Sequence, residues 1–83
     1  MSAKLSLTRK ARKEFSRLSL KERKKIIKKL EALQADPYLG KTLRGKLKGL
    51  CSLKAWPYRI IYEVTSLKQL TVLQIIHRQK AYR

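Results

Sequence analysis

The chain opens with a short stretch in which apolar and polar residues alternate, followed by a stretch with the period of a helix. The alternation of leucines with polar residues predicts a strand over residues 4–7. Thr8 follows as a candidate helix N-cap, and the residues after it carry one apolar stripe at helical spacing. That stripe consists of Ala11, Phe15 and Leu18. We therefore expect a short first helix over residues 8–18.

A second helix is marked by a capping box, in which Ser19 is followed three residues later by Glu22. Apolar residues then gather on one side of the expected helix and lysines on the opposite side. The apolar set is Ile26, Ile27, Leu30 and Leu33, and the lysines are Lys21, Lys24, Lys25, Lys28 and Lys29. The helix is expected to end near Ala35, because "DPYLG" supplies a helix-breaking Pro37 and a turn glycine, Gly40.

Beyond residue 50 the pattern changes to that of strands, after a basic segment, "KTLRGKLKGL", which reads as a loop. The expected strands are 51–55 (CSLKA), 58–64 (YRIIYEV) and 70–77 (LTVLQIIH). Short turns between them predict an antiparallel meander. In the middle strand, Tyr58 and Tyr62 share one face and Arg59 projects from the other. Trp56, beside a proline at the first turn, is expected to pack over the core.

The order of the expected elements predicts an α+β fold. We expect one domain over residues 1–83, with the order β-α-α-β-β-β and two N-terminal helices packed on a small antiparallel sheet. No apolar run approaches the roughly 20 residues of a membrane-spanning helix, and the N-terminus lacks the apolar stretch of a signal peptide. We therefore expect a cytoplasmic protein that contacts no membrane.

Charge dominates the composition, because 22 Lys and Arg residues against 5 Asp and Glu give a net charge of +17. Such a chain binds polyanions, of which nucleic acid is the first candidate; an acidic protein or membrane surface would satisfy the same charge. The single cysteine, Cys51, excludes an intramolecular disulfide and lacks the companions of a zinc site. We expect no metal and no cofactor.

Three segments carry a resemblance to a known family. "LRGKLKG", the strand "YRIIYEV" and the closing "HRQKAY" occur in an order and at a spacing that resemble the RelE/ParE superfamily of toxins from type II toxin-antitoxin modules. The resemblance covers essentially the whole chain. It implies neutralisation by a cognate acidic antitoxin and one of two activities: the RelE-like branch cleaves messenger RNA in the ribosomal decoding site, and the ParE-like branch poisons DNA gyrase. The two branches share a fold, so the residues must decide between them.

The resemblance also implies a set of catalytic residues for RNA cleavage without metal, in which a 2′-hydroxyl attacks the neighbouring phosphate. The residues at the family's positions are Lys54, Arg59, His77, Arg78 and Tyr82. Arg59 and Arg78 would hold the phosphate charge, and Lys54 would neutralise it or exchange a proton. His77 suits proton transfer because its ordinary pKa is near neutrality. Tyr82 would stack on a base or donate a proton.

Further features qualify this prediction. Basic residues of the loop are expected to contact the RNA backbone; these are Arg44, Lys46 and Lys48. Ser52 stands where some RNA-cleaving members carry an additional cation. Arg59 could instead pair with Glu63 on the same strand face, and His77 could be an ordinary residue at a strand end. The catalytic reading requires His77 and Arg78 to converge with Arg59 on one face of the sheet.

We therefore predict a toxin that inhibits translation as a ribosome-dependent endonuclease acting on messenger RNA, with contacts to ribosomal RNA. The alternatives are a gyrase inhibitor, in which the same residues are not catalytic, and an inactive basic module that only binds nucleic acid.

Overall fold

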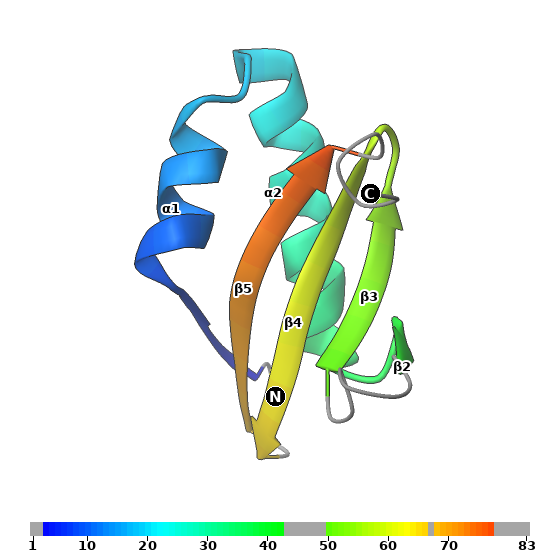
Figure 1. Cartoon of the computed structure of the whole chain (residues 1–83). Coiled ribbons are helices and arrows are strands. Elements are labelled where there is room, and N and C mark those ends of the chain that lie inside the picture. Colours follow the sequence, from blue (N-terminus) through cyan, green and yellow to red (C-terminus); the bar gives the residue numbers. More distant parts are fainter. Residues whose placement is uncertain (1–2, 43–49, 67, 78–83) are drawn as a thin grey trace.

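Two helices lie on one face of a mixed sheet in the computed structural model, which describes residues 3–42, 50–66 and 68–77 (Figure 1). The elements are β1 (Lys4–Leu7), α1 (Arg9–Ser16), α2 (Leu20–Ala35), β2 (Lys41–Thr42), β3 (Leu50–Ala55), β4 (Tyr58–Ser66) and β5 (Gln69–His77). The five strands lie in the order β1-β5-β4-β3-β2. The predicted α+β order is confirmed, with one short strand, β2, added where a loop was expected.

Both helices begin at the caps that the sequence predicts. Thr8 Oγ1 accepts a hydrogen bond from Ala11 N at 3.1 Å. Ser19 and Glu22 form the capping box, because Glu22 N donates to Ser19 Oγ and the Glu22 carboxylate accepts from Ser19 N. Residue 35 ends α2 as expected, whereas α1 ends at Ser16, two residues earlier than expected. Neither of these helices is long and apolar enough to cross a membrane.

The sheet is mixed rather than purely antiparallel. β3, β4 and β5 form the expected antiparallel meander, and β2 pairs antiparallel with β3. β1 pairs parallel with β5. The parallel pairing arises because both helices lie between β1 and the meander in the sequence and provide the long crossover that a parallel neighbour requires.

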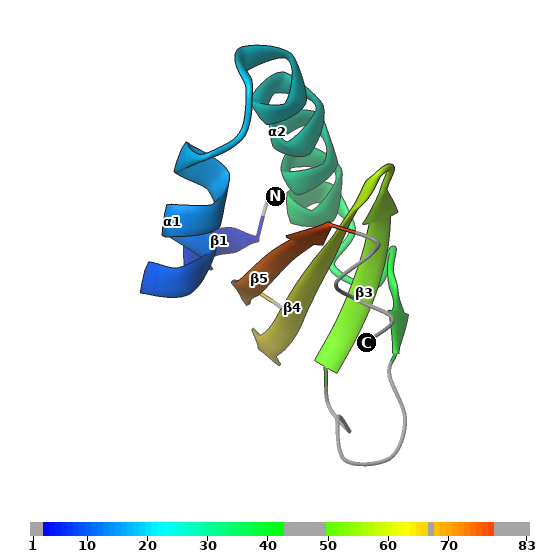
Figure 2. The same ribbon diagram turned by 45° about the horizontal axis from the view of Figure 1, so that its top comes forward.

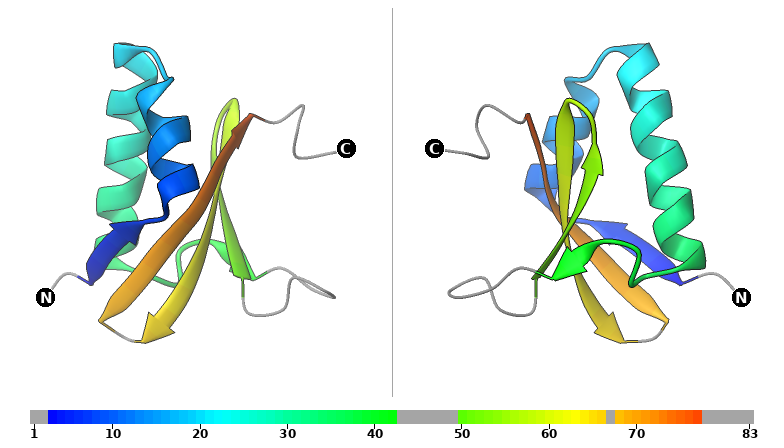
Figure 3. Two further views of the ribbon diagram at one scale, coloured as in Figure 1. Left: turned by 60° about the vertical axis from the view of Figure 1, so that its left-hand side comes forward. Right: turned by 90° about the vertical axis from the view of Figure 1, so that its right-hand side faces the viewer.

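The core lies between α2 and the helix-facing side of the sheet, as the side views in Figure 3 show. The fully buried large side chains come from α2 and the three long strands. They are Ile26, Leu33, Ile60, Tyr62, Leu70 and Val72. Ile27, which the pattern groups with the core residues of α2, is 45% exposed. The other face of the sheet carries no helix of the described residues.

β1 pairs only with the first half of β5, which leaves the edge of the second half open. Helix α1 covers that open edge. Thr8 Oγ1 donates to Leu73 O at 2.9 Å, and Ile75 N donates to the Glu14 carboxylate at 2.9 Å. Side chains of α1 thus satisfy backbone groups that would otherwise lie at an exposed strand edge.

The hydroxyl of Tyr62 joins the middle of the sheet to the turn after α2. Tyr62 Oη donates to Pro37 O at 3.0 Å and accepts from Gly40 N at 2.9 Å. The Tyr62 side chain is completely buried, so its hydroxyl cannot exchange these two partners for water without opening the core. This pair of hydrogen bonds fixes the turn against the sheet.

Removal of this hydroxyl should destabilise the fold. In Tyr62→Phe, the partly buried N–H of Gly40 and C=O of Pro37 lose their partner, which should lower the free energy of unfolding by about 1–3 kcal/mol. The matched control is Tyr38→Phe, because the Tyr38 side chain is 63% exposed and its replacement should change stability by less than about 0.5 kcal/mol. Urea denaturation measures both. Equal stability of the two variants would contradict this role.

The same hydroxyl should make stability depend on alkaline pH. Burial raises the pKa of Tyr62 above its ordinary value of 10.0. A group whose pKa is raised by folding contributes stability that is complete below the unfolded pKa and is lost as the pH rises through the folded pKa. The stability difference between the wild type and Tyr62→Phe should therefore be constant up to about pH 9 and shrink above pH 10. Denaturation at stepped pH measures it, and a difference that grows with pH would contradict the assignment.

Candidate functional site

A cationic cleft lies at the edge of the sheet formed by β2 and β3. Its volume is about 360 Å³. It is lined by Leu39, Gly40, Lys41, Ser52, Leu53, Lys54 and Arg59. None of these described lining residues is acidic, and three of them carry positive charge: Lys41, Lys54 and Arg59. Its chemistry is that of a site for an anion.

The register of the strands explains why these cations share one cleft. Lys54 lies directly opposite Arg59, and Lys41 lies opposite Ser52. Residues that face each other across an antiparallel pair project from the same side of a sheet. Ser52 and Lys54, two positions apart on β3, also share a side. All three cations therefore project from the sheet face opposite the helices, near the edge that lies farthest from α1 (Figure 2).

The three cations differ in exposure and in chemistry. Lys54 and Lys41 are exposed, and Arg59 is half-buried. A half-buried guanidinium is held in position by its surroundings and presents paired N–H donors that match two oxygens of one phosphate. The flexible lysine side chains add positive charge that can adjust to the position of a bound anion. Together they can bind a phosphate and stabilise additional negative charge on it.

His77 lies on the opposite face of the sheet from these cations. It pairs with Tyr58, which projects toward the helices, whereas Arg59 pairs with Ile76. The rings of His77 and Tyr58 contact each other edge to face, with centroids 5.4 Å apart. The convergence of His77 with Arg59 that the catalytic reading requires therefore does not occur.

A β-bulge causes this separation. The register of β4 and β5 shifts after Ile61, so that Gln74 lies opposite Ile61 and Val72 lies opposite Tyr62, which leaves Leu73 as an extra residue. Strict alternation from the buried Val72 would place His77 on the face of Arg59. The extra residue reverses the alternation, buries Ile75 and turns His77 toward the helices.

His77 instead belongs to a second, smaller cavity of about 240 Å³ beneath the helices. Glu14, Arg17 and Tyr58 also line this cavity. The Tyr58 hydroxyl donates to the Glu22 carboxylate and holds the pKa of Glu22 below its ordinary value. Burial, aided by Glu22, raises the pKa of Tyr58. The contact between Tyr58 and Glu22 joins the N-terminal end of α2 to the sheet.

Five residues of the predicted site lie outside the described residues, so their roles stay predictions. They are Arg44, Lys46, Lys48, Arg78 and Tyr82. In the sequence, Arg78 and Tyr82 follow the end of β5, and the other three fall between β2 and β3.

Sequence reasoning missed Lys41, which it counted only as part of a basic loop. Recognising Lys41 would have required predicting a strand beside β3. A strand of two residues is too short to show the alternation of apolar and polar residues by which strands are recognised. The expectation for Trp56 is wrong, since its side chain is 63% exposed. The hairpin turn is instead tied to α2 through its backbone, because Lys25 Nζ donates to Trp56 O at 3.0 Å.

Comparison with known proteins assigns the chain to a family. The sequence model described as the ParE toxin of the type II toxin-antitoxin system parDE matches residues 5–82. The chain belongs to this family. It is thus a toxin of the RelE/ParE superfamily, and the resemblance noted in the sequence is confirmed. No curated protein matches the chain.

Solved structures from both branches share the toxin's fold. A chain of the RelBE2 toxin-antitoxin complex from Mycobacterium tuberculosis superposes with a TM-score of 0.85 at 23% identity, over 94% of this chain and 100% of the other. The isolated RelE toxin from E. coli gives 0.78 at 23% identity, over 99% and 96%. A chain of the ParDE system from P. aeruginosa gives 0.72 at 21% identity, over 92% and 96%. At these identities the likeness concerns the fold alone.

The placement of His77 predicts a contribution to stability. An edge-to-face contact between aromatic rings contributes about 0.5–1.5 kcal/mol beyond buried area, so His77→Gln should lower the unfolding free energy by that amount. In a Tyr58→Leu background the same replacement should cost less. Urea denaturation of the four proteins of this double-mutant cycle measures the coupling. An equal cost in both backgrounds would contradict the contact.

Proposed function

We propose that the toxin cleaves messenger RNA on the ribosome. The observation that carries the proposal is the convergence of Lys41, Lys54 and Arg59 in one cleft on the helix-free face of the sheet. RNA brings its own nucleophile to such a site, so a protein can accelerate cleavage by orienting a phosphate and stabilising charge on it.

The reaction proceeds by attack of the 2′-hydroxyl oxygen on the adjacent phosphorus. A bond forms between the 2′-oxygen and phosphorus, the bond from phosphorus to the 5′-oxygen breaks, and the 2′-proton leaves as the 5′-oxygen gains one. The phosphate carries additional negative charge in the transition state. We assign that charge to Arg59, which presents two N–H donors to two oxygens, with Lys54 directly opposite.

The proton transfers require groups near the same phosphate. Arg78 and Tyr82 follow β5 in the sequence, and we propose Arg78 as a second charge clamp and Tyr82 as a proton donor or stacking group. The sequence predicts His77 as a proton-transfer group. Its place on the helix-facing side of the sheet favours a structural role in contact with Tyr58 instead. Lys54 is then the described residue best placed to exchange a proton with the RNA.

The net charge of the whole toxin, rather than any single lysine outside the cleft, would bring it to the ribosome. That charge of +17 is spread over much of the surface, so each exposed lysine outside the cleft contributes only a small part of it. Such a surface attracts ribosomal RNA over long range, and salt should weaken the attraction.

An acidic antitoxin is the proposed protein partner. Related folds have been solved as toxin-antitoxin complexes, including RelE with RelB from Pyrococcus horikoshii and YoeB with YefM from Staphylococcus aureus. We propose that an acidic antitoxin neutralises this toxin by covering part of its cationic surface.

Inhibition of DNA gyrase is the second candidate function. The observation that favours it is the family model, whose description names the parDE system. Under this reading the cleft would hold an acidic group of the target without any bond being broken. A gyrase supercoiling assay with the purified toxin would detect this activity.

Cleavage should depend on Arg59. Addition of purified toxin to translating ribosomes should cut the message, and Arg59→Ala should slow cutting by roughly 10²–10³-fold, the usual effect of removing one donor to transition-state charge. Lys28→Ala is the matched control, because its side chain is exposed on α2, and it should cut within a few-fold of the wild-type rate. Primer extension on the message measures both.

Two outcomes would contradict the proposal. One is an uncut message in the presence of toxin whose circular dichroism spectrum matches that of a folded protein; supercoiling inhibition by the same sample would then favour the gyrase reading. The other is an equal cutting rate for Arg59→Ala and Lys28→Ala.

A further inference from the structure

The cleft combines an apolar wall with a cationic rim. Leu39 lines it together with Lys41, Lys54 and Arg59, whereas the side chain of Leu53, which also borders the cleft, packs against the core. Leu39 is 48% exposed, and its neighbour Tyr38 is 63% exposed. Large apolar side chains held at the surface beside a cavity are typical of a site that binds a ligand with an apolar surface of its own.

The wall is held rigidly against the sheet. Gly40, between Leu39 and Lys41, donates its N–H to Tyr62 Oη. A Cβ at Gly40 would lie 2.6 Å from that oxygen and 2.7 Å from Ser52 O, so the glycine backbone packs directly on β3 and leaves no space for a side chain. The residues on either side of Gly40 are therefore set at fixed places on the rim of the cleft, as a preorganised binding site requires.

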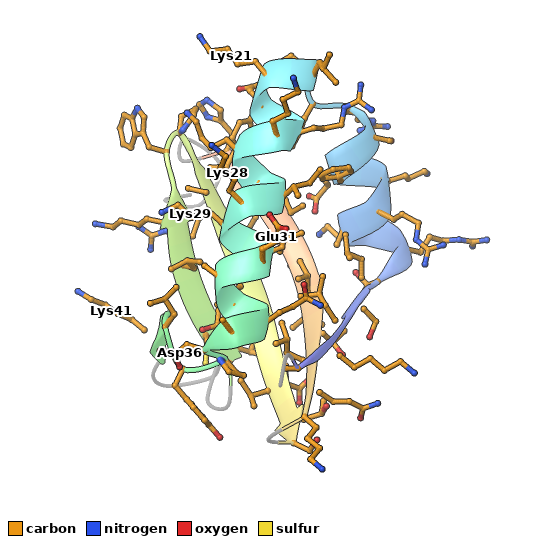
Figure 4. The ribbon with its side chains drawn as sticks, turned by 180° about the vertical axis from the view of Figure 1, so that it is seen from behind. Lys21, Lys28, Lys29, Glu31, Asp36 and Lys41 are labelled. Atoms are coloured by element: carbon orange, nitrogen blue, oxygen red, sulfur yellow. The ribbon has the colours of Figure 1, made fainter. Side chains whose placement is uncertain are left out.

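The three cations are spaced to contact more than one phosphate. Lys41 lies opposite Ser52, two residues along β3 from Lys54. Two residues of a strand span roughly 6.6 Å, and the neighbouring strand adds an offset of about 4.8 Å. Lys41 is thus set apart from the directly opposed pair of Lys54 and Arg59. Figure 4 shows that Lys41 projects from the sheet edge, clear of the lysines on α2.

A ligand with a flat apolar surface and anionic groups on either side matches this arrangement. A nucleotide within a single strand of RNA has these properties, because its base has an apolar face and a phosphate lies on each side of its ribose. The cleft volume of about 360 Å³ lies within the range of sites for small ligands, roughly 300–1,000 Å³.

We propose that the cleft is a subsite for one nucleotide of single-stranded RNA, next to the scissile phosphate. Lys41 binds the neighbouring phosphate, and Leu39 contacts the base. The identity of the bound strand as substrate rests on the proposed function, whereas the binding itself requires no cleavage. Lys41 is a positioning residue, because by anchoring the adjacent nucleotide it aligns the 2′-hydroxyl for in-line attack.

The test uses the full-length toxin and a trinucleotide RNA with 2′-O-methyl groups, which binds but cannot be cut. Lys41→Ala should weaken its binding five-fold or more, and Leu39→Ser should also weaken it. Lys28→Ala removes the same charge from an exposed position on α2 and should change binding less than two-fold. Lys41→Arg should retain most of the affinity. Amide resonances of Gly40 and Ser52 should shift when the trinucleotide is added to the wild type.

Cleavage assays with unmodified message separate this proposal from the proposed function. Lys41→Ala should raise the KM more than it lowers the rate at saturation. If the wild type cuts RNA but Lys41→Ala binds the trinucleotide as Lys28→Ala does, the subsite is wrong and the proposed function stands. If the wild type cuts nothing but binds the trinucleotide through Lys41, the proposed function is wrong and the subsite stands. Absence of both binding and cleavage would overturn both.

Discussion

The buried hydroxyl of Tyr62 is the constraint on which the site depends. It bonds to Pro37 O and Gly40 N and so holds the turn after α2 against the middle of the sheet. This contact brings a turn that follows a helix close to β3, where the glycine at its centre packs on the strand backbone. The position of Lys41 on the cleft is a consequence. A side chain in the core thus supports the position of charge on the opposite face of the sheet, because it holds the turn that leads into β2.

The second constraint is the bulge in β5, which divides the predicted site between two faces of the sheet. Thr8 bonds to the carbonyl of the extra residue, Leu73, and Glu14 bonds to the N–H of Ile75, so α1 supports the strand on both sides of the irregularity. His77 then lies beneath the helices against Tyr58. The cations of the cleft lie on the other, helix-free face. Charge stabilisation is therefore the chemistry that the described residues favour, rather than proton transfer by histidine.

The sequence predicted the elements well because their signals are local. A capping box, an apolar stripe and alternating strands depend on neighbours only a few residues apart, and both helices start at the predicted caps. The pairing of Lys54 with Arg59 also follows from a hairpin with a two-residue turn. The positions of Lys41 and His77 depend on a short strand, a parallel crossover and a bulge. These arise from tertiary contacts that leave no period in the sequence.

Family membership establishes a type II toxin, and the proposal that its target is messenger RNA rests on the cationic cleft. The central claim is that the 2′-hydroxyl of the message is the nucleophile and that the toxin supplies charge and position. The chemistry of the cut ends tests this claim most directly. Mass spectrometry of message recovered from ribosomes treated with toxin should find 2′,3′-cyclic phosphate or its hydrolysis product on one fragment and a 5′-hydroxyl on the other. A 5′-phosphate end, or a message that stays intact, would contradict it.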